Sequence, residues 1–354
     1  MQEINMNDIA PIEVPSKSSV HKAGSILRKV DASSEELEQA LVTLSRWRAL
    51  HSYPINTFQA YLRLKVKKSD YDDPIIAQRL KRLPSIIQKL KRYPRMGLET
   101  MQDIGGLRVI LKDVSAVYNL YSSLSKSRFK HIPLLPPNDY IKKPKPDGYR
   151  SLHQVYKYVN NNHPELNILH IEIQIRTRLQ HAWATAVETL GIVEKSSFKT
   201  GEGDEKFKTF FKLSSALFSM DEKQPVLEEY RDHTHEEIVR ELKELENDLQ
   251  ITSKLQGLAL TAKQIESNST NYSGYHLMHL DTRKNKISIL NFSRQQLEFA
   301  ENVYASQEQA NKNNPDVSIV LIAANSIREI KKAYPNYFLD TNDFVKHLMR
   351  MMNE

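Results

Sequence analysis

The chain has no cysteine and no long apolar run. Without thiols it cannot form disulfides, zinc–thiolate sites or a thiol nucleophile, which is compatible with a reducing cytosol. The longest apolar run, around Ile319 to Ala324, is far too short to cross a bilayer. The first residues, Met1 to Ser19, are polar and contain no apolar segment of the kind that marks a secretory signal. We therefore expect a cytoplasmic protein with no membrane partner.

Positive charge is in surplus along the chain. The 354 residues carry a formal net charge of +7, and the sequence pI is about 9.2. A surplus of this sign favours polyanionic partners, either nucleotides or nucleic acid, through the field of the whole protein. Many soluble proteins are mildly basic without such a partner, so charge alone leaves both interpretations open. The length allows two domains or three, with ample apolar material for at least one core.

The first half of the chain has the pattern of helices followed by strands. Leucines and a tryptophan at spacings of three and four predict a helical segment over 33–65, with Ser34 as its cap. A second helix, dense in Lys and Arg, is predicted over 74–91. The run LHIEIQI alternates apolar and polar residues, which is typical of a strand with one buried face. Strands are expected over 107–111, 151–159 and 169–175, and helices over 114–125 and from about Thr177.

A proline-rich stretch separates two of these strands. Between Pro133 and Gly148 the sequence reads PLLPPNDYIKKPKPDG. So many prolines exclude a helix or a central strand, and the stretch is predicted to be a loop. Loops of this length and composition often carry function.

The second half is expected to be a helical region followed by a small separate domain. Segments 207–218 and 228–265 have helical patterns, and the second has an apolar stripe that we expect to pack on the protein itself. From Tyr275 onward, two strands, a helix, a third strand and a closing helix from Ile327 predict a small α+β domain. The expected parts are a flexible lead (1–22), a mixed α+β domain (23–200), a helical connector (201–270) and a C-terminal α+β domain (271–354).

Two carboxylates are placed where neighbouring strands could bring them together. Asp103 precedes one predicted strand in MQDIGGLRVI, and Glu172 lies within another in HIEIQIRT. Such a pair could hold Mg²⁺, which takes one or two carboxylates together with phosphate oxygens and water. One of them could instead accept the proton of an attacking hydroxyl. Taken alone, a turn-capping Asp103 and a solvated Glu172 are the more ordinary interpretations.

Cationic side chains gather around the same segments. Phosphoryl transfer needs such groups, because the triphosphate and the transferring group spread negative charge over many oxygens. A basic helix face on its own is common and would be weak evidence. The cations are Arg79, Lys81, Lys89, Arg108 and Arg176.

The segment DYIKKPKPDGYRSLH adds groups suited to a nucleotide-like acceptor. Gly148 permits a turn that places Tyr149 at a rim, where its ring can stack on a base. His153 can donate to a phosphate or pair with Glu172, although a lone histidine in a strand is more often a packed core residue. The side chains that can meet phosphates are Lys143, Lys145 and Arg150.

Together these segments resemble the synthetase domain of the RelA/SpoT family, the enzymes that make the alarmone (p)ppGpp. The resemblance covers roughly Ser34 to Gly191, with the motifs RLKRLPSIIQKL, DIGGLRVI, DYIKKPKPDGYRSLH, EIQIRT and HAWATAVE in family order. It implies an α+β, nucleotidyltransferase-like fold with a mixed β-sheet flanked by helices. It also implies transfer of the β,γ-pyrophosphate of ATP to a ribose 3′-hydroxyl, which leaves AMP, with Mg²⁺ as cofactor.

The resemblance assigns roles residue by residue. Asp103 and Glu172 look like the metal ligands, Glu172 also like the base, and Arg108 joins them as a catalytic group. The implied ATP-binding set is Arg79, Lys81, Ser85, Lys89 and Arg108. The implied acceptor-binding set is Lys143, Lys145, Tyr149, Arg150, His153, Gln174 and Arg176.

Departures from the family pattern bear on the acceptor. Asp147 stands where alarmone synthetases usually have asparagine, and a carboxylate there disfavours a free diphosphate. The HD-type hydrolase domain and the ribosome-sensing modules of long family members are not found. Some toxic relatives pyrophosphorylate the 3′-hydroxyl of the tRNA CCA end, which blocks translation. We therefore expect tRNA as the acceptor, with GDP or GTP as the alternative.

The last part of the chain contains KAYPNYF, in which Tyr334 and Tyr337 lie three apart. It resembles the YxxY element of fused toxin–antitoxin proteins such as the CapRel group, whose C-terminal domain can occlude the ATP site in cis. Ordinary core aromatics near a helix kink would have the same pattern. Three hypotheses stay open: a tRNA-modifying toxin of phage-defence type that a protein trigger releases from its own C-terminal domain, a (p)ppGpp or (p)ppApp synthetase, and a non-catalytic RNA-binding module.

Overall fold

The computed structural model describes residues 13–69, 71–193, 205–249, 251–252, 255, 274–281, 286–311, 314, 317–324 and 342–353. Within these ranges no helix combines the length and the apolar character needed to cross a bilayer. Short 3₁₀ turns lie at Leu98–Thr100, Pro164–Ile168, Glu228–Tyr230 and Arg294–Gln296.

The chain begins with helices that pack into the main core. They are α1 (Lys17–Ile26), α2 (Ser34–Ala49) and α3 (Ser52–Lys68). Helix α1 occupies part of the expected flexible lead, because Val20 and Ala23 are buried in the core. The cap of α2 is Ser33, one residue before the expected position. Its hydroxyl accepts from Glu36 N, and the Glu36 carboxylate accepts from Ser33 N, a reciprocal capping box.

The prediction of a helix over 74–91 is wrong for the first half of this range. Residues Ile75–Leu80 form strand β1, and helix α4 begins only at Leu83 and ends at Arg92. The β-branched pair at the start of β1 favours a strand, and β1 pairs antiparallel with the next strand along its whole length. Pro84 lies in the first turn of α4, where its missing N–H costs no helical hydrogen bond.

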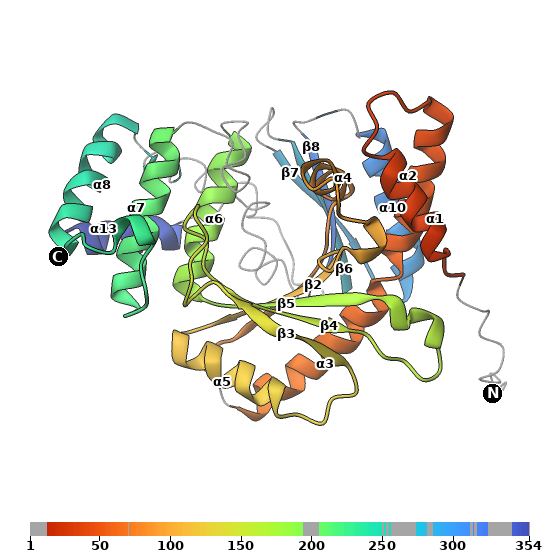
Figure 1. The fold of residues 1–354 in the computed structure, drawn as a ribbon, viewed down its shortest axis with the longest axis horizontal. Coiled ribbons are helices and arrows are strands. Elements are labelled where there is room, and N and C mark those ends of the chain that lie inside the picture. The colour runs from red at the N-terminus through yellow and green to blue at the C-terminus, as the bar shows by residue number, and fades with distance from the viewer. Residues whose placement is uncertain are drawn as a thin grey trace.

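A five-stranded mixed sheet forms the centre of the molecule, in the order β1-β2-β5-β4-β3. Strands β2 and β5 run parallel, and the other neighbours run antiparallel. Helices α3 and α5 cover one face of the sheet, below it in Figure 1. This arrangement confirms the predicted α+β fold with a mixed sheet and flanking helices. The remaining bounds are β2 (Gly105–Leu111), α5 (Val114–Ser125), β3 (Ile132–Asp139), β4 (Leu152–Lys157) and β5 (His170–Thr177).

The proline-rich stretch is only partly the loop that we predicted. Its first half is strand β3, which is exposed over most of its length. Proline cannot donate to a neighbouring strand, so it is tolerated at a sheet edge, and β3 is the last strand of this sheet. The second half of the stretch begins at Tyr140 and is a loop, which continues past the stretch to Ser151 and reaches the site described below.

Four helices form a second core beside the sheet. They are α6 (Arg178–Val193), α7 (Glu205–Asp221), α8 (His235–Leu249) and α13 (Asn342–Asn353). The predicted stripe of α8 packs inward through Ile238 and Leu242. Helix α13, near the end of the chain, also belongs to this core: Phe344 is fully buried against Phe211 and Phe218. It therefore packs with the helical region and not with the small C-terminal sheet.

That small sheet has the order β7-β6-β8 and is covered by α10. Its core includes Leu277, Ala300 and Tyr304. Strand β8 lies alongside β1, the edge strand of the central sheet, so the two sheets meet at the strand that carries Arg79. The bounds are β6 (Gly274–Asp281), β7 (Lys286–Phe292), α10 (Leu297–Ala310) and β8 (Val317–Ala324).

Candidate active site

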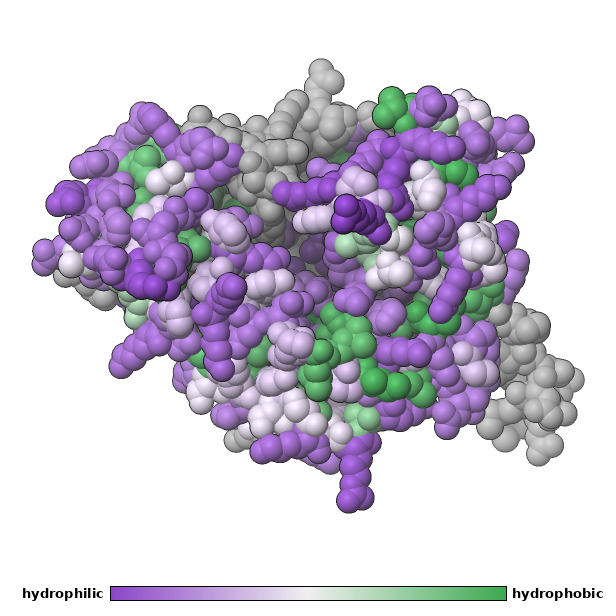
Figure 2. Space-filling model, viewed as in Figure 1, coloured by the Kyte–Doolittle hydropathy of each residue, from purple (hydrophilic) through white to green (hydrophobic). Residues whose placement is uncertain are grey.

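A cleft of about 780 Å³ opens on the sheet face opposite α3 and α5, between α4 and α6. Figure 2 shows that this side of the molecule is largely hydrophilic, with a recess near its centre. Most of the residues singled out from the sequence line this cleft. They are Arg79, Lys81, Lys89, Asp103, Arg108, Lys145, Tyr149, His153, Glu172, Gln174 and Arg176.

Strand alternation explains why these side chains share one face. Along β5 the isoleucines at 171, 173 and 175 are buried in the main core. Successive strand residues point to opposite faces, so the residues between them point into the cleft. These are Glu172, Gln174 and Arg176. The same rule sends His153 of β4 and Arg108 of β2 to this face, while Leu152 and Leu107 enter the core.

The half of the cleft beside α4 is built around Asp103. Its carboxylate pairs with Lys81 Nζ at 3.1 Å and Lys89 Nζ at 2.8 Å. Burial raises the pKa of Asp103, but the two ammonium groups outweigh it and bring the pKa to about 2. Burial in turn lowers the pKa of Lys81, with Asp103 opposing the change. Asp103 is therefore a carboxylate at every working pH.

The two carboxylates fit a Mg²⁺ ion bound together with a polyphosphate. Asp103 Oδ1 is buried and has no hydrogen-bond partner among the described residues, so one hard oxygen ligand is available. Glu172 lines the same small hollow and is close enough to Asp103 for the two charges to interact. The described residues contain no cluster of three or more His, Cys, Asp or Glu side chains suited to a metal. Mg²⁺ is commonly held by one or two protein carboxylates and takes its other ligands from phosphates and water.

Three guanidinium groups meet on the floor of the cleft. Arg176 is 2% exposed, and burial together with the charges of Arg108 and Arg79 lowers its pKa well below the usual value. Like charges that interact in a buried site destabilise one another, and an anion placed among them would relieve the repulsion. The arrangement suits a polyphosphate.

A buried hydrogen-bond chain crosses the acceptor half of the cleft. His153 Nδ1 lies 3.0 Å from Glu172 Oε1, and His153 Nε2 lies 2.9 Å from the Tyr149 hydroxyl. Burial lowers the pKa of His153, but Tyr149 and Glu172 raise it to about 9. Burial raises the pKa of Glu172, while the imidazolium and a hydrogen bond from Gln174 lower it below its usual range. His153 is thus a cation and Glu172 an anion at neutral pH.

Tyr149 sits in a tight turn that holds it against the cleft wall. Gly148 has φ of +90°, and a Cβ there would come within 3.0 Å of Ser215 and 3.1 Å of Trp183, so only glycine fits. Asp147 Oδ1 accepts from Tyr149 N at 2.9 Å. Asparagine could accept the same bond, so the turn does not require the charge that Asp147 adds to the cleft. Lys145 Nζ lies 5.0 Å from the centre of the Tyr149 ring, where a stacked base would displace it.

Several predicted site residues lie elsewhere. Arg150 is buried and paired with Glu222 Oε2 at 2.7 Å, so the structure does not place it among the cleft residues. Lys143 is exposed on the loop beside the cleft, and Ser85 lies in the first turn of α4. Tyr334 and Tyr337 fall outside the described residues.

Other cleft residues escaped the sequence analysis. Tyr140 lies in the loop motif and holds Lys145 over its ring at 4.4 Å. Glu188 comes from α6, and an acidic residue one position after the buried Val187 was a signal that could have identified it. Nothing in their local patterns distinguished the remaining lining residues, which are Arg95, Met96, Thr100, Gln102, Asn138 and Val155.

Comparison with known proteins places this site in a family. A family model described as the region found in RelA/SpoT proteins matches residues 78–202. The GTP pyrophosphokinase YjbM of Bacillus subtilis is 36% identical over 146 residues, which are 37% of this chain and 68% of that protein. The GTP pyrophosphokinase YwaC of the same organism is 34% identical over 112 residues, 30% of this chain. The match spans about half of YwaC, 52% of its length.

A solved structure is similar over part of this chain. The small alarmone synthetase 1 of Bacillus subtilis, bound to its product pppGpp, is 26% identical, with a TM-score of 0.43. The match covers 50% of this chain and 92% of that one. With YjbM matched over more than two thirds of its length and the family region containing the cleft, the assignment is clear: this chain belongs to the RelA/SpoT family.

Proposed function

We propose that this protein is a pyrophosphokinase that transfers the β,γ-pyrophosphate of ATP to a ribose 3′-hydroxyl, preferentially that of the tRNA 3′ end. The observation that carries the proposal is the position of two ionised carboxylates, Asp103 and Glu172, between a cationic wall and an acceptor wall of one cleft. Relatives that share this region are GTP pyrophosphokinases by name.

The transfer step divides the cleft into two halves. The acceptor 3′-oxygen attacks the β-phosphorus of ATP, and the bond from that phosphorus to the oxygen bridging to the α-phosphate breaks. The bridging oxygen leaves with AMP. Glu172 accepts the hydrogen bond, and then the proton, of the hydroxyl. His153 holds Glu172 ionised and oriented, since it contacts one carboxylate oxygen at 3.0 Å while Gln174 donates to the other at 2.7 Å.

The donor triphosphate belongs on the α4 side. Arg79, Lys81, Lys89 and Arg108 supply positive charge there, and preorganised cations stabilise the charge that develops during transfer. Asp103 and Glu172 would hold Mg²⁺, which when bound neutralises phosphate charge. Lys81 and Lys89 now pair with Asp103. ATP would draw these lysines to its phosphates and release the carboxylate for the metal.

The shape and charge around Tyr149 support a polynucleotide acceptor. Asp147 adds negative charge within the acceptor half, which opposes a free nucleoside diphosphate or triphosphate. Lys142 and Lys143 are exposed on the neighbouring loop, outside the cleft. An RNA end presents a terminal ribose whose 5′ oxygen carries one singly charged phosphodiester in place of a diphosphate or triphosphate. It would therefore bring less negative charge near Asp147, and the phosphates of the preceding nucleotides could reach the outer lysines.

Guanine nucleotides are the second candidate acceptor. The names of YjbM and YwaC specify GTP for those proteins. A (p)ppGpp synthetase would use the same Asp103 and Glu172 and would need a diphosphate or triphosphate to be tolerated near Asp147.

We also propose that the C-terminal part regulates transfer in cis, as in fused toxin–antitoxin relatives. The support is a buried contact at the donor half. Arg48 donates to Lys81 O at 2.7 Å and to Glu308 Oε2 at 3.4 Å, and its guanidinium lies 4.4 Å from the centre of the Tyr304 ring. Glu308 Oε1 also accepts from Leu83 N at 3.3 Å, which caps α4 where its own sequence offers no side-chain cap. Helix α10 thus stabilises the turn between β1 and α4, which carries Lys81.

An acceptor assay tests the proposed function. The full chain is incubated with Mg²⁺, γ-³²P-ATP and either deacylated tRNA, GDP or GTP. We expect label on tRNA and an equal amount of AMP. Label on GDP or GTP alone would refute the tRNA acceptor and favour the alarmone reading, and release of ADP in place of AMP would refute pyrophosphate transfer itself.

Regulation in cis is better tested by point substitutions than by truncation. Removing everything after Tyr275 would also remove α13, whose Phe344 is buried in the helical core. Loss of activity in such a truncation would reflect exposure of that core. Substitutions in α10 leave α13 in place.

A further inference from the structure

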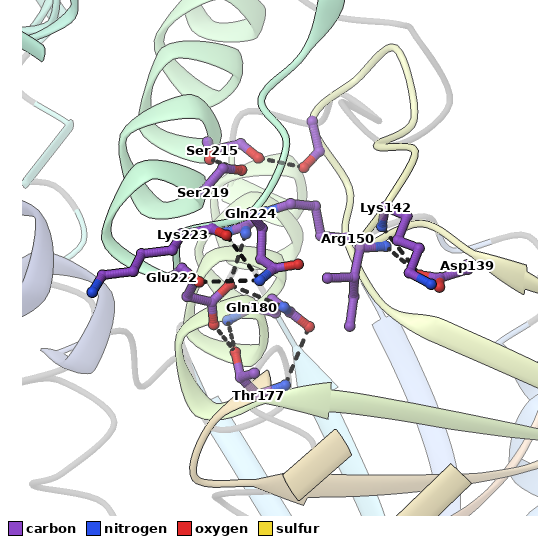
Figure 3. Close-up of polar contacts among 12 residues, drawn as sticks. Asp139, Lys142, Arg150, Thr177, Gln180, Ser215, Ser219, Glu222, Lys223 and Gln224 are labelled. Carbon is purple, nitrogen blue, oxygen red and sulfur yellow. Dashed lines mark hydrogen bonds and ion pairs between the residues drawn. The ribbon is translucent and has the colours of Figure 1, made fainter. Parts of the chain in front are cut away.

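A buried carboxylate behind the acceptor half joins the segments that form it. Glu222 follows α7 directly, and its side chain is 9% exposed. Figure 3 shows it among residues from the Tyr149 turn, the end of β5 and the start of α6. It does not line the cleft.

Glu222 uses both carboxylate oxygens. Oε2 accepts from Arg150 Nη1 at 2.7 Å and from Gln180 Nε2 at 3.0 Å, and Oε1 accepts from the Thr177 hydroxyl. Thr177 Oγ1 also accepts from Gln180 N at 3.1 Å, which caps the first turn of α6. One side chain therefore ties the end of α7 to two segments that are distant from it in sequence, the Tyr149 turn and the β5–α6 junction.

The position of the Glu222 carboxylate is energetically unfavourable unless these contacts compensate for it. A negative charge at the C-terminal end of a helix opposes the helix dipole, and burial of a charge is unfavourable unless it is paired. The helix ends at this point because Lys223 adopts a left-handed φ of 54° and Gln224 N donates back to Ser219 O at 2.8 Å. The chain thus forms a fixed helix end that presents Glu222 to Arg150.

The residues held by Glu222 are the immediate neighbours of cleft residues. Arg150 follows Tyr149, and Thr177 follows Arg176; both Tyr149 and Arg176 line the acceptor half. On the other side of the turn, Ser215 of α7 donates to Gly148 O at 2.6 Å. The α7 region therefore contacts the Tyr149 turn on both sides of Tyr149, at Gly148 through Ser215 and at Arg150 through Glu222.

We infer that Glu222 is a positioning residue for the acceptor subsite: through Arg150 and Thr177 it fixes Tyr149 and Arg176 relative to each other. Its effect is expected to be larger on the acceptor half, because Glu222 reaches the donor residues Arg108 and Arg79 only through Arg176, and the donor half is otherwise held by α4 and Arg48, which Glu222 does not contact. The inference deepens the proposed function and rests on it for the identity of the subsite. The geometric part, restraint of the Tyr149 turn by α7, stands independently.

Glu222→Gln is the variant that tests the inference. It keeps the size of the side chain and removes the charge that pairs with Arg150. Glu229→Gln is the matched control from the same helical region, since Glu229 pairs with Lys212 at 3.1 Å on the surface, with the two side chains 46% and 29% exposed. Arg150→Lys serves as a second variant if Glu222→Gln does not fold, because it keeps the charge but loses the guanidinium geometry.

Amide hydrogen exchange on the full-length variants gives a readout that needs no activity. We expect faster exchange in Glu222→Gln at residues 145–151 and 176–180, unchanged exchange in β1 and α4, and the wild-type pattern in Glu229→Gln. Unchanged exchange at the Tyr149 turn, or faster exchange across the whole chain, would overturn the inference.

Kinetics with deacylated tRNA and ATP then test the subsite. We expect the KM for tRNA to rise by about tenfold or more, since small misplacements of binding groups have effects of this order, while the KM for ATP changes much less. Equal loss for both substrates would overturn the acceptor-specific role. If wild type labels neither tRNA nor GTP, the proposed function fails, and the exchange result still decides the geometric part.

Discussion

The contact between Arg48 and Glu308 makes cis regulation testable with one substitution. Both side chains are only 8% exposed, so their charges are largely removed from water. Glu308→Gln keeps an oxygen that can accept from Leu83 N and cap α4, but it removes the charge facing Arg48. Hydrogen bonds to charged groups contribute about 1.5–3 kcal/mol. Tyr304 would still contact the guanidinium, so we expect a loss of about 2 kcal/mol in the docking of α10.

A loss of about 2 kcal/mol corresponds to about a thirtyfold shift in the docking equilibrium. If docked α10 restrains the donor half, AMP formation from ATP in the presence of tRNA should rise by up to this factor. The control is Glu298→Gln, an exposed position in the first turn of the same helix, which should behave as wild type. Hydrogen exchange of α10 in the same samples reports undocking. Faster exchange of α10 without any gain in AMP formation would refute the proposal that docked α10 regulates transfer.

Three further outcomes follow from the geometry. The pKa of His153 is raised to about 9 from 6.5, so its contribution to stability is complete below about pH 6.5 and is lost as pH rises through about 9. Burial raises the pKa of its partner Tyr149, but His153 and Arg176 lower it to about 8. Transfer should therefore fall between about pH 8 and 9, and a pH–rate profile of His153→Gln, which removes the imidazolium, should lack that fall. Asp103→Asn should abolish the Mg²⁺-dependent rise in melting temperature with a non-hydrolysable ATP analogue, and a retained rise would remove Asp103 from the metal site. Phe344→Ala should lower the free energy of unfolding by about 3–5 kcal/mol in denaturant titrations, whereas Met349→Ala, at a position 41% exposed, should have little effect.

Strand periodicity accounts for most of the cleft residues that could be predicted. The alternation in LHIEIQI correctly assigned Ile171 and Ile173 to the core and left Glu172 and Gln174 on the other face. Local pattern failed at 75–80, where charged and long side chains suggested a helix. Residues 75–80 form a strand because they pair with β2. Such pairing is a tertiary contact, which a local sequence pattern does not reveal.

Contacts between segments that are distant in the sequence could not be predicted from local sequence patterns. Glu222 meets Arg150 across 72 positions, and Glu308 meets Leu83 across 225. Arg150 shows the consequence most clearly. Its motif suggested a phosphate contact, but its buried partner comes from a helix that no local pattern links to it. Helix α13 likewise has an ordinary amphipathic pattern that does not indicate which core it joins.

Glu172 is the residue on which pyrophosphate transfer depends most directly. The decisive measurement is the rate of AMP formation coupled to label transfer from γ-³²P-ATP, compared between wild type and Glu172→Gln at neutral pH. We expect acceptor-dependent AMP formation in wild type and a loss of about a thousandfold in the variant, since a missing general base and metal ligand has effects of this order. Transfer by Glu172→Gln at a rate near that of wild type would contradict the assignment of the active site.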